Sequence, residues 1–172
     1  MIKSGAAIVA ALCALFFVAA VDPAAADDKK AVGAYLFKFT GGLPPDTYVP
    51  GLATLHSDGT VSSVTGSDES GPLGVFVVKN SAVHGVWSAH GSRGVRATAL
   101  FLNFDPLGGQ VVSITKLRIV AEFEKGFDTG SGVFFDSIYV CPTFITCPDP
   151  LTTAPMIPEP AAGRPFSVHR IQ

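Results

Sequence analysis

Residues 111–124 read VVSITKLRIVAEFE. One set of alternating positions carries Leu117, Ile119, Ala121 and Phe123, and the other set carries Lys116, Arg118, Glu122 and Glu124. Successive side chains of a β-strand point to opposite faces, so this alternation predicts a strand with one buried face and one charged, solvated face. Such strands are typical of antiparallel sheets.

Comparable short runs occur before and after this strand. They cover residues 32–39, 52–61, 75–78, 84–89, 95–104, 132–140 and 165–171. Turns rich in Gly, Pro and Asp separate them, and residues 64–74 are predicted to form a loop over one end of the domain. Asp58-Gly59 within residues 52–61 predicts a hairpin with a type I′ turn, which requires positive φ. Residues 27–30 form a polar stub, and no segment predicts a convincing helix.

About eight or nine short strands at nearly regular spacing indicate a barrel or a sandwich. Consecutive runs are linked as hairpins, which favours a meander that closes on itself over a Greek key. The predicted fold is therefore an all-β, antiparallel up-and-down β-barrel of about eight strands. Closure also removes the exposed edges that such apolar strands would otherwise present.

The N-terminus carries the pattern of an export signal. Met1-Ile2-Lys3 is a short cationic start, residues 5–20 are uninterruptedly apolar, and Ala24-Ala25-Ala26 supplies small residues. The apolar run is shorter than the roughly 20 residues that a bilayer core requires. We therefore expect a cleavable signal peptide at residues 1–26, cut between Ala20 and Ala26, and a single barrel domain at residues 27–172. The mature protein is expected to be periplasmic or secreted, with no membrane attachment after cleavage.

Two cysteines remain after signal cleavage, because Cys13 leaves with the signal. Cys141 and Cys147 are an even pair in a chain expected to be exported, which predicts a disulfide at the start of a Cys/Pro-rich loop at residues 141–163. Free thiols are the alternative. The spacing differs from the Cys-x-x-Cys of a redox site, and further zinc ligands do not gather around it.

Composition excludes several classes of function. The chain has 172 residues, a formal net charge of -2 and no run of Lys or Arg, so nothing predicts a nucleic-acid partner. It contains no Gly-x-Ser-x-Gly elbow and no phosphate-binding glycine loop, which leaves hydrolases, kinases and dehydrogenases without support. The four His lack metal-site spacing to a carboxylate, so no metal and no cofactor are predicted.

Several motifs resemble those of known small barrels. Gly33-Ala34-Tyr35 resembles the Gly-x-Trp start of lipocalins, and Arg170 resembles the arginine that packs over that aromatic ring. The order of motifs is similar to that of a bacterial group of exported, lipocalin-like barrels; the motifs are LATLHSDGTV at 52–61, HGVW at 84–87 and ATALFLNFD at 97–105. The resemblance implies an eight-stranded calycin-type or allene-oxide-cyclase-type barrel with an apolar cavity, and no settled ligand.

An eight-stranded barrel is either filled by its own side chains or holds one small ligand. The leading hypothesis is an exported barrel that binds a small hydrophobic molecule. Its candidate binding residues are Tyr35, Phe37, His56, Trp87, Phe101 and Tyr139. One alternative is a cyclase or isomerase that transfers a proton through His56 or Asp136. The other is a filled structural or interaction module that uses its proline-rich loop as a contact surface.

Overall fold

The computed structural model describes residues 28–39, 48–65, 79–105, 107, 109–143 and 146–172. The elements in these ranges are α1 (Asp28–Ala31), β1 (Gly33–Phe39), β2 (Val49–Leu55), β3 (Thr60–Thr65), β4 (Lys79–Asn80), β5 (Val83–His90), β6 (Gly94–Phe104), β7 (Val111–Phe123), β8 (Thr129–Val140) and β9 (Arg164–Arg170). The predicted signal peptide, the predicted strand at 75–78 and most of the predicted loop at 64–74 lie outside the described residues. Among those described, no helix is long and apolar enough to cross a bilayer.

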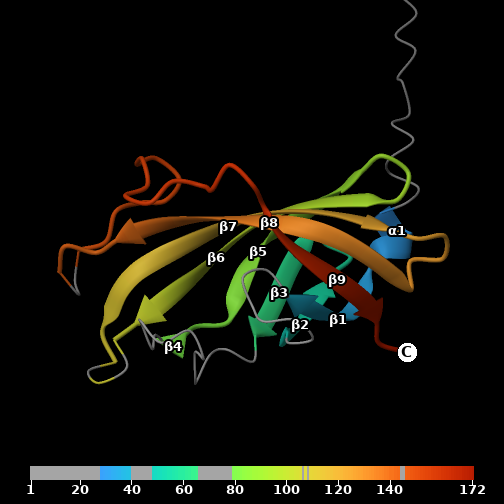
Figure 1. Ribbon diagram of the computed structural model, residues 1–172, viewed down its shortest axis with the longest axis horizontal. Helices are drawn as coiled ribbons and strands as arrows, with labels where there is room; N and C mark the ends of the chain where they lie inside the picture. The colour runs from blue at the N-terminus through green and yellow to red at the C-terminus, as the bar shows by residue number, and fades with distance from the viewer. Residues whose placement is uncertain (1–27, 40–47, 66–78, 106, 108, 144–145) are drawn as a thin grey trace, which may run out of the picture.

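Eight of these strands close into a ring (Figure 1). Its order is β1-β2-β3-β5-β6-β7-β8-β9, every pairing is antiparallel, and β1 returns to β9 through pairs such as Leu36 with His169. Neighbours in the ring are also neighbours along the chain, so the predicted up-and-down barrel is confirmed. The short β4 pairs with the end of β6, where Asn80 faces Asn103.

The strands of the ring differ in length. β6, β7 and β8 have 11, 13 and 12 residues, whereas β1, β2 and β9 have 7 each. The three long strands therefore continue past the short ones, away from α1 (Figure 1). We call the end that carries α1 the helix end, and the end where β6 stops and β7 starts the distal end.

A loop covers the edge of β8 that β9 leaves free. Pairing between β8 and β9 stops at Phe134 with Arg164. Beyond it, Ile138 pairs with Ile157 of the 141–163 loop: the Ile138 N–H donates to the Ile157 carbonyl at 2.9 Å, and the Ile157 N–H donates back at 3.1 Å. Unpaired strand edges are templates for aggregation, so this bridge protects the protruding part of β8.

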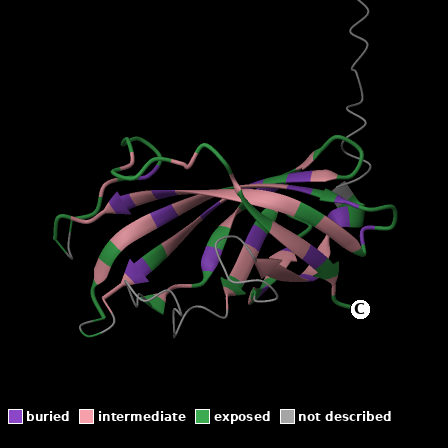
Figure 2. Cartoon of the chain, viewed as in Figure 1, coloured by how far each residue is buried: buried purple, intermediate pink, exposed green. Residues whose placement is uncertain are grey.

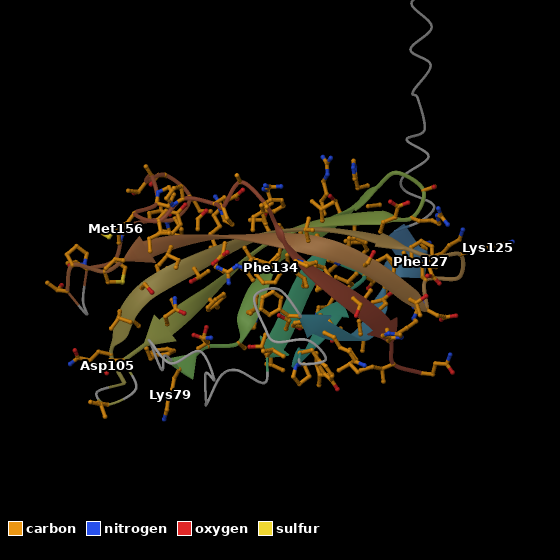
Figure 3. All side chains as sticks on the ribbon, viewed as in Figure 1. Lys79, Asp105, Lys125, Phe127, Phe134 and Met156 are labelled. Carbon is orange, nitrogen blue, oxygen red and sulfur yellow. A yellow bond between two sulfur atoms is a disulfide. The ribbon has the colours of Figure 1, made fainter. Side chains whose placement is uncertain are left out.

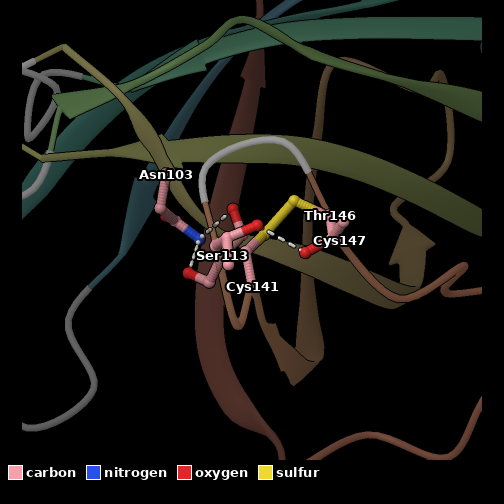
Figure 4. Close-up of a disulfide and its surroundings, with 6 residues drawn as sticks. Asn103, Ser113, Cys141, Thr146 and Cys147 are labelled. Carbon is pink, nitrogen blue, oxygen red and sulfur yellow. Dashed lines mark hydrogen bonds between the residues drawn. A yellow bond between two sulfur atoms is a disulfide. The ribbon is translucent and has the colours of Figure 1, made fainter.

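The predicted disulfide is present between Cys141 and Cys147 (Figure 4). It lies at the start of the same loop, and the Cys141 N–H donates to the Val112 carbonyl of β7 at 2.9 Å. The cross-link and this hydrogen bond together anchor the loop beside the sheet.

Replacing Cys141 and Cys147 by Ala is expected to lower the free energy of unfolding by about 2 kcal/mol, the loop-closure estimate for so short a ring. Limited proteolysis should then cut first within residues 142–156, because the loop loses one anchor. Urea unfolding and mapping of the first cleavage site check both effects. Cleavage at the same rate as in the oxidised parent would contradict the anchoring role.

The β2–β3 hairpin is confirmed, but its turn is not type I′. Gly59 has a φ of 82°, and Asp58 is not among the residues with positive φ, whereas type I′ requires positive φ at both central positions. The Gly59 N–H donates to the His56 carbonyl at 3.2 Å. Asp58 Oδ1 accepts from the Thr60 N–H at 2.9 Å and from its hydroxyl at 2.7 Å, which fixes this alternative turn.

Tyr35 closes the helix end of the barrel. Its side chain is 2% exposed, its hydroxyl donates to the Ala31 carbonyl of α1 at 2.7 Å, and its ring centroid lies 5.2 Å from that of Phe123. Arg170 Cζ lies 5.8 Å from the Tyr35 centroid, and the guanidinium also donates to the Lys30 and Val32 carbonyls. The packing of arginine over the first-strand aromatic, expected from the lipocalin resemblance, is therefore present.

Tyr35→Phe is expected to lower stability at neutral pH by about 1 kcal/mol, because it removes a buried hydrogen bond. Burial raises the pKa of Tyr35 above 10.0, its value in an unfolded chain. A raised pKa means that this contribution to stability is complete below the unfolded pKa and is lost as pH rises through the folded pKa. The parent should therefore lose stability at alkaline pH more steeply than Tyr35→Phe. Urea titrations across this range test it, with the exposed Tyr48→Phe as control; parallel pH profiles for parent and Tyr35→Phe would contradict it.

Candidate functional site: a cavity inside the barrel

The inward-facing side chains line a cavity of about 460 Å³. It is bounded by all eight ring strands and by β4. Its lining residues are Tyr35, Phe37, Phe39, Val49, Ala53, Leu55, Val61, Ser63, Thr65, Asn80, Ser81, Val83, Val95, Ala97, Ala99, Phe101, Asn103, Thr115, Leu117, Ile119, Ala121, Phe123, Phe134, Asp136, Ile138, Arg164, Phe166 and Val168. Its volume lies in the range of pockets that hold small organic molecules.

The inner face is not a solid core. Phe101, Leu117 and Ile119 pack against the buried cluster and yet are only partly buried, although they line the cavity. Intermediate burial, drawn in pink, is common along the strands of the ring (Figure 2). Side chains in a filled core would be close-packed on every side. The described side chains therefore leave open space inside the barrel.

Small residues on the wall explain why this space exists. Ala53, Ala97, Ala99 and Ala121 occupy inward positions on β2, β6 and β7, where larger side chains would fill the barrel. Two glycines let aromatic rings lie against the wall. A Cβ at Gly51 would meet the Phe37 ring at 2.1 Å, and one at Gly132 would meet the Phe166 ring at 2.6 Å.

The helix end of the cavity is apolar. Tyr35 and Phe123 line it there, and Phe127 packs behind Phe123 with a centroid distance of 5.4 Å. Phe127 comes from the β7–β8 turn and lies beside α1 (Figure 3). Its φ of 64° is unfavourable for a non-glycine residue, and its ring is 5% exposed, so burial of the ring offsets the backbone cost.

Polar side chains gather toward the distal end of the cavity. Asn103, near the end of β6, is buried, and its amide donates to Ser113 Oγ at 2.8 Å (Figure 4). The same amide donates to Thr115 Oγ1 at 2.8 Å. Asn80 also lines the cavity, and its Oδ1 is buried without a partner among the described residues. The polar groups of the wall are therefore concentrated toward the distal end, among apolar residues such as Phe101 and Ile138.

The charged groups of the wall form one ion pair. Arg164 Nη2 lies 3.1 Å from Asp136 Oδ2, and Asp136 is 15% exposed in its side chain. Asp136 Oδ1 is buried and has no hydrogen-bond partner among the described residues. Arg164 Cζ also lies 6.0 Å from the centroid of Phe134, which sits in the middle of the molecule (Figure 3).

Three of the six candidate binding residues line the cavity: Tyr35, Phe37 and Phe101. Trp87 does not line it; the residue belongs to the buried core cluster, and its indole N–H donates to the His56 carbonyl at 2.9 Å. His56 is exposed just after β2, where its Nε2 lies 3.1 Å from Ser62 Oγ. Of the two proton-transfer candidates, Asp136 lines the cavity and His56 does not.

Tyr139 is also absent from the cavity wall, although it is only 4% exposed. Its neighbour Ile138 faces inward, so Tyr139 faces outward on β8. The 141–163 loop passes over this outer side of the sheet, where the Pro150 carbonyl accepts from Lys116 Nζ at 3.3 Å and Glu159 pairs with Arg118 at 2.7 Å. Tyr139 is therefore buried outside the barrel, beneath a loop.

The residues that sequence reasoning missed include four polar wall residues and one turn residue. Asn103 interrupts the apolar alternation that runs through Phe101, which is a signal that a closer reading of β6 would have found. Asn80, Thr115 and Arg164 become informative only when the ring brings their strands together. Phe127 reads as an ordinary turn residue. The described residues contain no group of three or more His, Cys, Asp or Glu that could hold a metal ion.

Comparisons of the chain with protein-family models, with curated proteins and with solved structures give no match.

Proposed function

We propose that this protein binds one small, largely apolar molecule inside its barrel. The observation that carries the proposal is the cavity of about 460 Å³, whose wall is mostly aliphatic and aromatic. Binding sites for small molecules are typically concave, mainly apolar and equipped with a few polar groups that orient the ligand. Transfer of an apolar molecule from water to such a wall is favourable by about 25 cal/mol for each Å² of apolar surface removed from water.

We further propose that the protein acts outside the cytoplasm. The signal-like residues 1–26 support this, and so does the Cys141–Cys147 disulfide, because disulfides persist mainly in oxidising compartments. A binding protein in such a compartment would carry or sequester a hydrophobic compound that is poorly soluble in water.

The test has two parts. Native mass spectrometry of the protein purified from an exported fraction should show an added mass that disappears on denaturation. Titration of delipidated protein with an uncharged fluorescent dye, such as N-phenylnaphthylamine, should give saturable binding to one site. Absence of both a co-purified mass and saturable dye binding by the folded protein would refute the proposal.

A second candidate function is acid/base catalysis at Asp136, favoured by the buried, unpartnered Oδ1 of a carboxylate on the cavity wall. A single carboxylate in an apolar cavity is sufficient for proton transfer to or from a bound substrate. In that case Asp136→Asn would abolish conversion of the co-purified compound and leave its binding intact. A compound that the parent protein returns unchanged would argue against this candidate.

A further inference from the structure

We propose that the ligand is an uncharged amphiphile whose head group donates a hydrogen bond to Asp136 at the polar side of the cavity. This inference deepens the proposed function and rests on it. The chemical class meant is an apolar body that ends in a neutral hydroxyl group, as opposed to a carboxylic acid or an amine.

The first step is the direction of polarity along the cavity. Its helix end is closed by Tyr35 and Phe123, which are buried and pack on one another. The buried side-chain atoms without a partner among the described residues, Asp136 Oδ1 and Asn80 Oδ1, come from the distal half of β8 and from β4. An amphiphile fits this wall with its apolar body toward Tyr35 and its head group toward Asp136.

The second step is the kind of hydrogen bond that the wall lacks. The two buried side-chain atoms without a partner among the described residues are Asp136 Oδ1 and Asn80 Oδ1, and both are acceptors. A buried polar atom without a partner is rare in native proteins and requires an explanation. A head group that brings a donor would satisfy such an atom, whereas one that only accepts would not.

The third step is access to the carboxylate. Asp136 Oδ2 already binds Arg164, and the side chain of Asp136 keeps 15% of its surface exposed. Oδ1 is buried, but rotation about the last side-chain bond of an Asp is soft, so a partial rotation can turn Oδ1 toward the cavity that Asp136 lines. One oxygen can therefore hold the guanidinium while the other accepts from a ligand.

The fourth step is the charge of the head group. Asp136 and Arg164 are the charged residues that line the cavity among the described residues, and their charges cancel. A carboxylate or an ammonium would lose its hydration on entering and would find no net opposite charge in return. A hydroxyl group loses less hydration and still supplies the donor.

The experiment compares three ligands of equal chain length, decanol, decanoic acid and decylamine, as competitors of N-phenylnaphthylamine at neutral pH. For the parent protein we expect decanol to bind about tenfold more tightly than either charged compound. Asp136→Leu should leave Arg164 unpaired in the wall and shift the preference toward decanoic acid. Arg164→Leu should leave Asp136 unpaired and shift the ligand preference toward decylamine.

The matched control is Glu122→Leu, which removes a carboxylate paired with an arginine on the outer face, Arg93 at 3.6 Å. It should keep the ligand order of the parent. If the parent prefers decanoic acid or decylamine, or if Asp136→Leu and Arg164→Leu both keep the parental order, the inference is wrong. Failure of the dye itself to bind would instead refute the proposed function. If Asp136→Leu does not fold by circular dichroism, the ligand order of the parent together with that of Arg164→Leu decides whether the inference holds.

Discussion

Ala53→Trp should weaken binding of an apolar dye at least about tenfold. Ala53 lines the cavity at the middle of β2, between Tyr35 on β1 and Ser63 on β3. An indole in place of the methyl group would project into the cavity and occupy space that the ligand needs. Overpacking of this kind commonly lowers stability by about 1–3 kcal/mol, so the variant is expected to remain folded.

Thr54→Trp is the matched control, because Thr54 is the next residue on the same strand and points to the opposite face. It adds the same bulk outside the barrel and should leave dye affinity unchanged. The measurement is a fluorescence titration of both variants after circular dichroism has established that they are folded. Parental affinity in folded Ala53→Trp would place the dye outside the barrel and remove the main support for the proposed function.

Trp87→Ala should lower the free energy of unfolding by about 3–5 kcal/mol, the usual cost of truncating a large buried aromatic side chain. Trp87 is 7% exposed and joins β5 to the β2–β3 turn twice: its indole N–H donates to the His56 carbonyl, and its backbone N–H donates to the Gly59 carbonyl at 2.7 Å. Because the side chain is outside the cavity wall, dye affinity should change little in the fraction that is folded.

Urea unfolding followed by circular dichroism measures this effect, because the variant loses the only tryptophan of the chain. Trp87→Phe should lose less stability, since it keeps most of the buried ring and gives up one hydrogen bond. Loss of dye binding by a fully folded Trp87→Ala would show that Trp87 contacts the dye. It would contradict the set of lining residues given above, which leaves Trp87 out.

The sequence correctly predicted β7 and its two faces for a simple reason. One face of this strand meets the barrel interior, and the other face carries charged residues such as Arg118 and Glu122. Alternation is then unambiguous, and Leu117 and Ile119 were correctly placed on the inner face. Similar patterns, together with turn residues between consecutive strands, were sufficient to predict an up-and-down barrel.

The same alternation does not place Tyr139, because both faces of β8 are covered. The inner face carries Phe134 and Ile138, and the outer face lies beneath the 141–163 loop, so aromatic residues occur at both parities. A period of two identifies the faces of a strand, but it does not say which face is inside when both are apolar. His56 lies outside the wall for another reason: it shares the face of Leu52 and Thr54, which is opposite to the face of Ala53 and Leu55 that lines the cavity.

The sequence by itself determined the class of the fold, the inner and outer faces of β7, and the disulfide. These depend on local periodicity, on turn chemistry and on the pairing of two nearby cysteines. Only the tertiary structure decided that the barrel is hollow and that Asp136, Arg164 and Asn80 share its wall. An open interior depends on how side chains from eight strands add up across the ring. Sequence patterns describe only neighbouring residues. Strand pairing over the whole chain determines which side chains face one another across the ring, and so how much of the interior they fill.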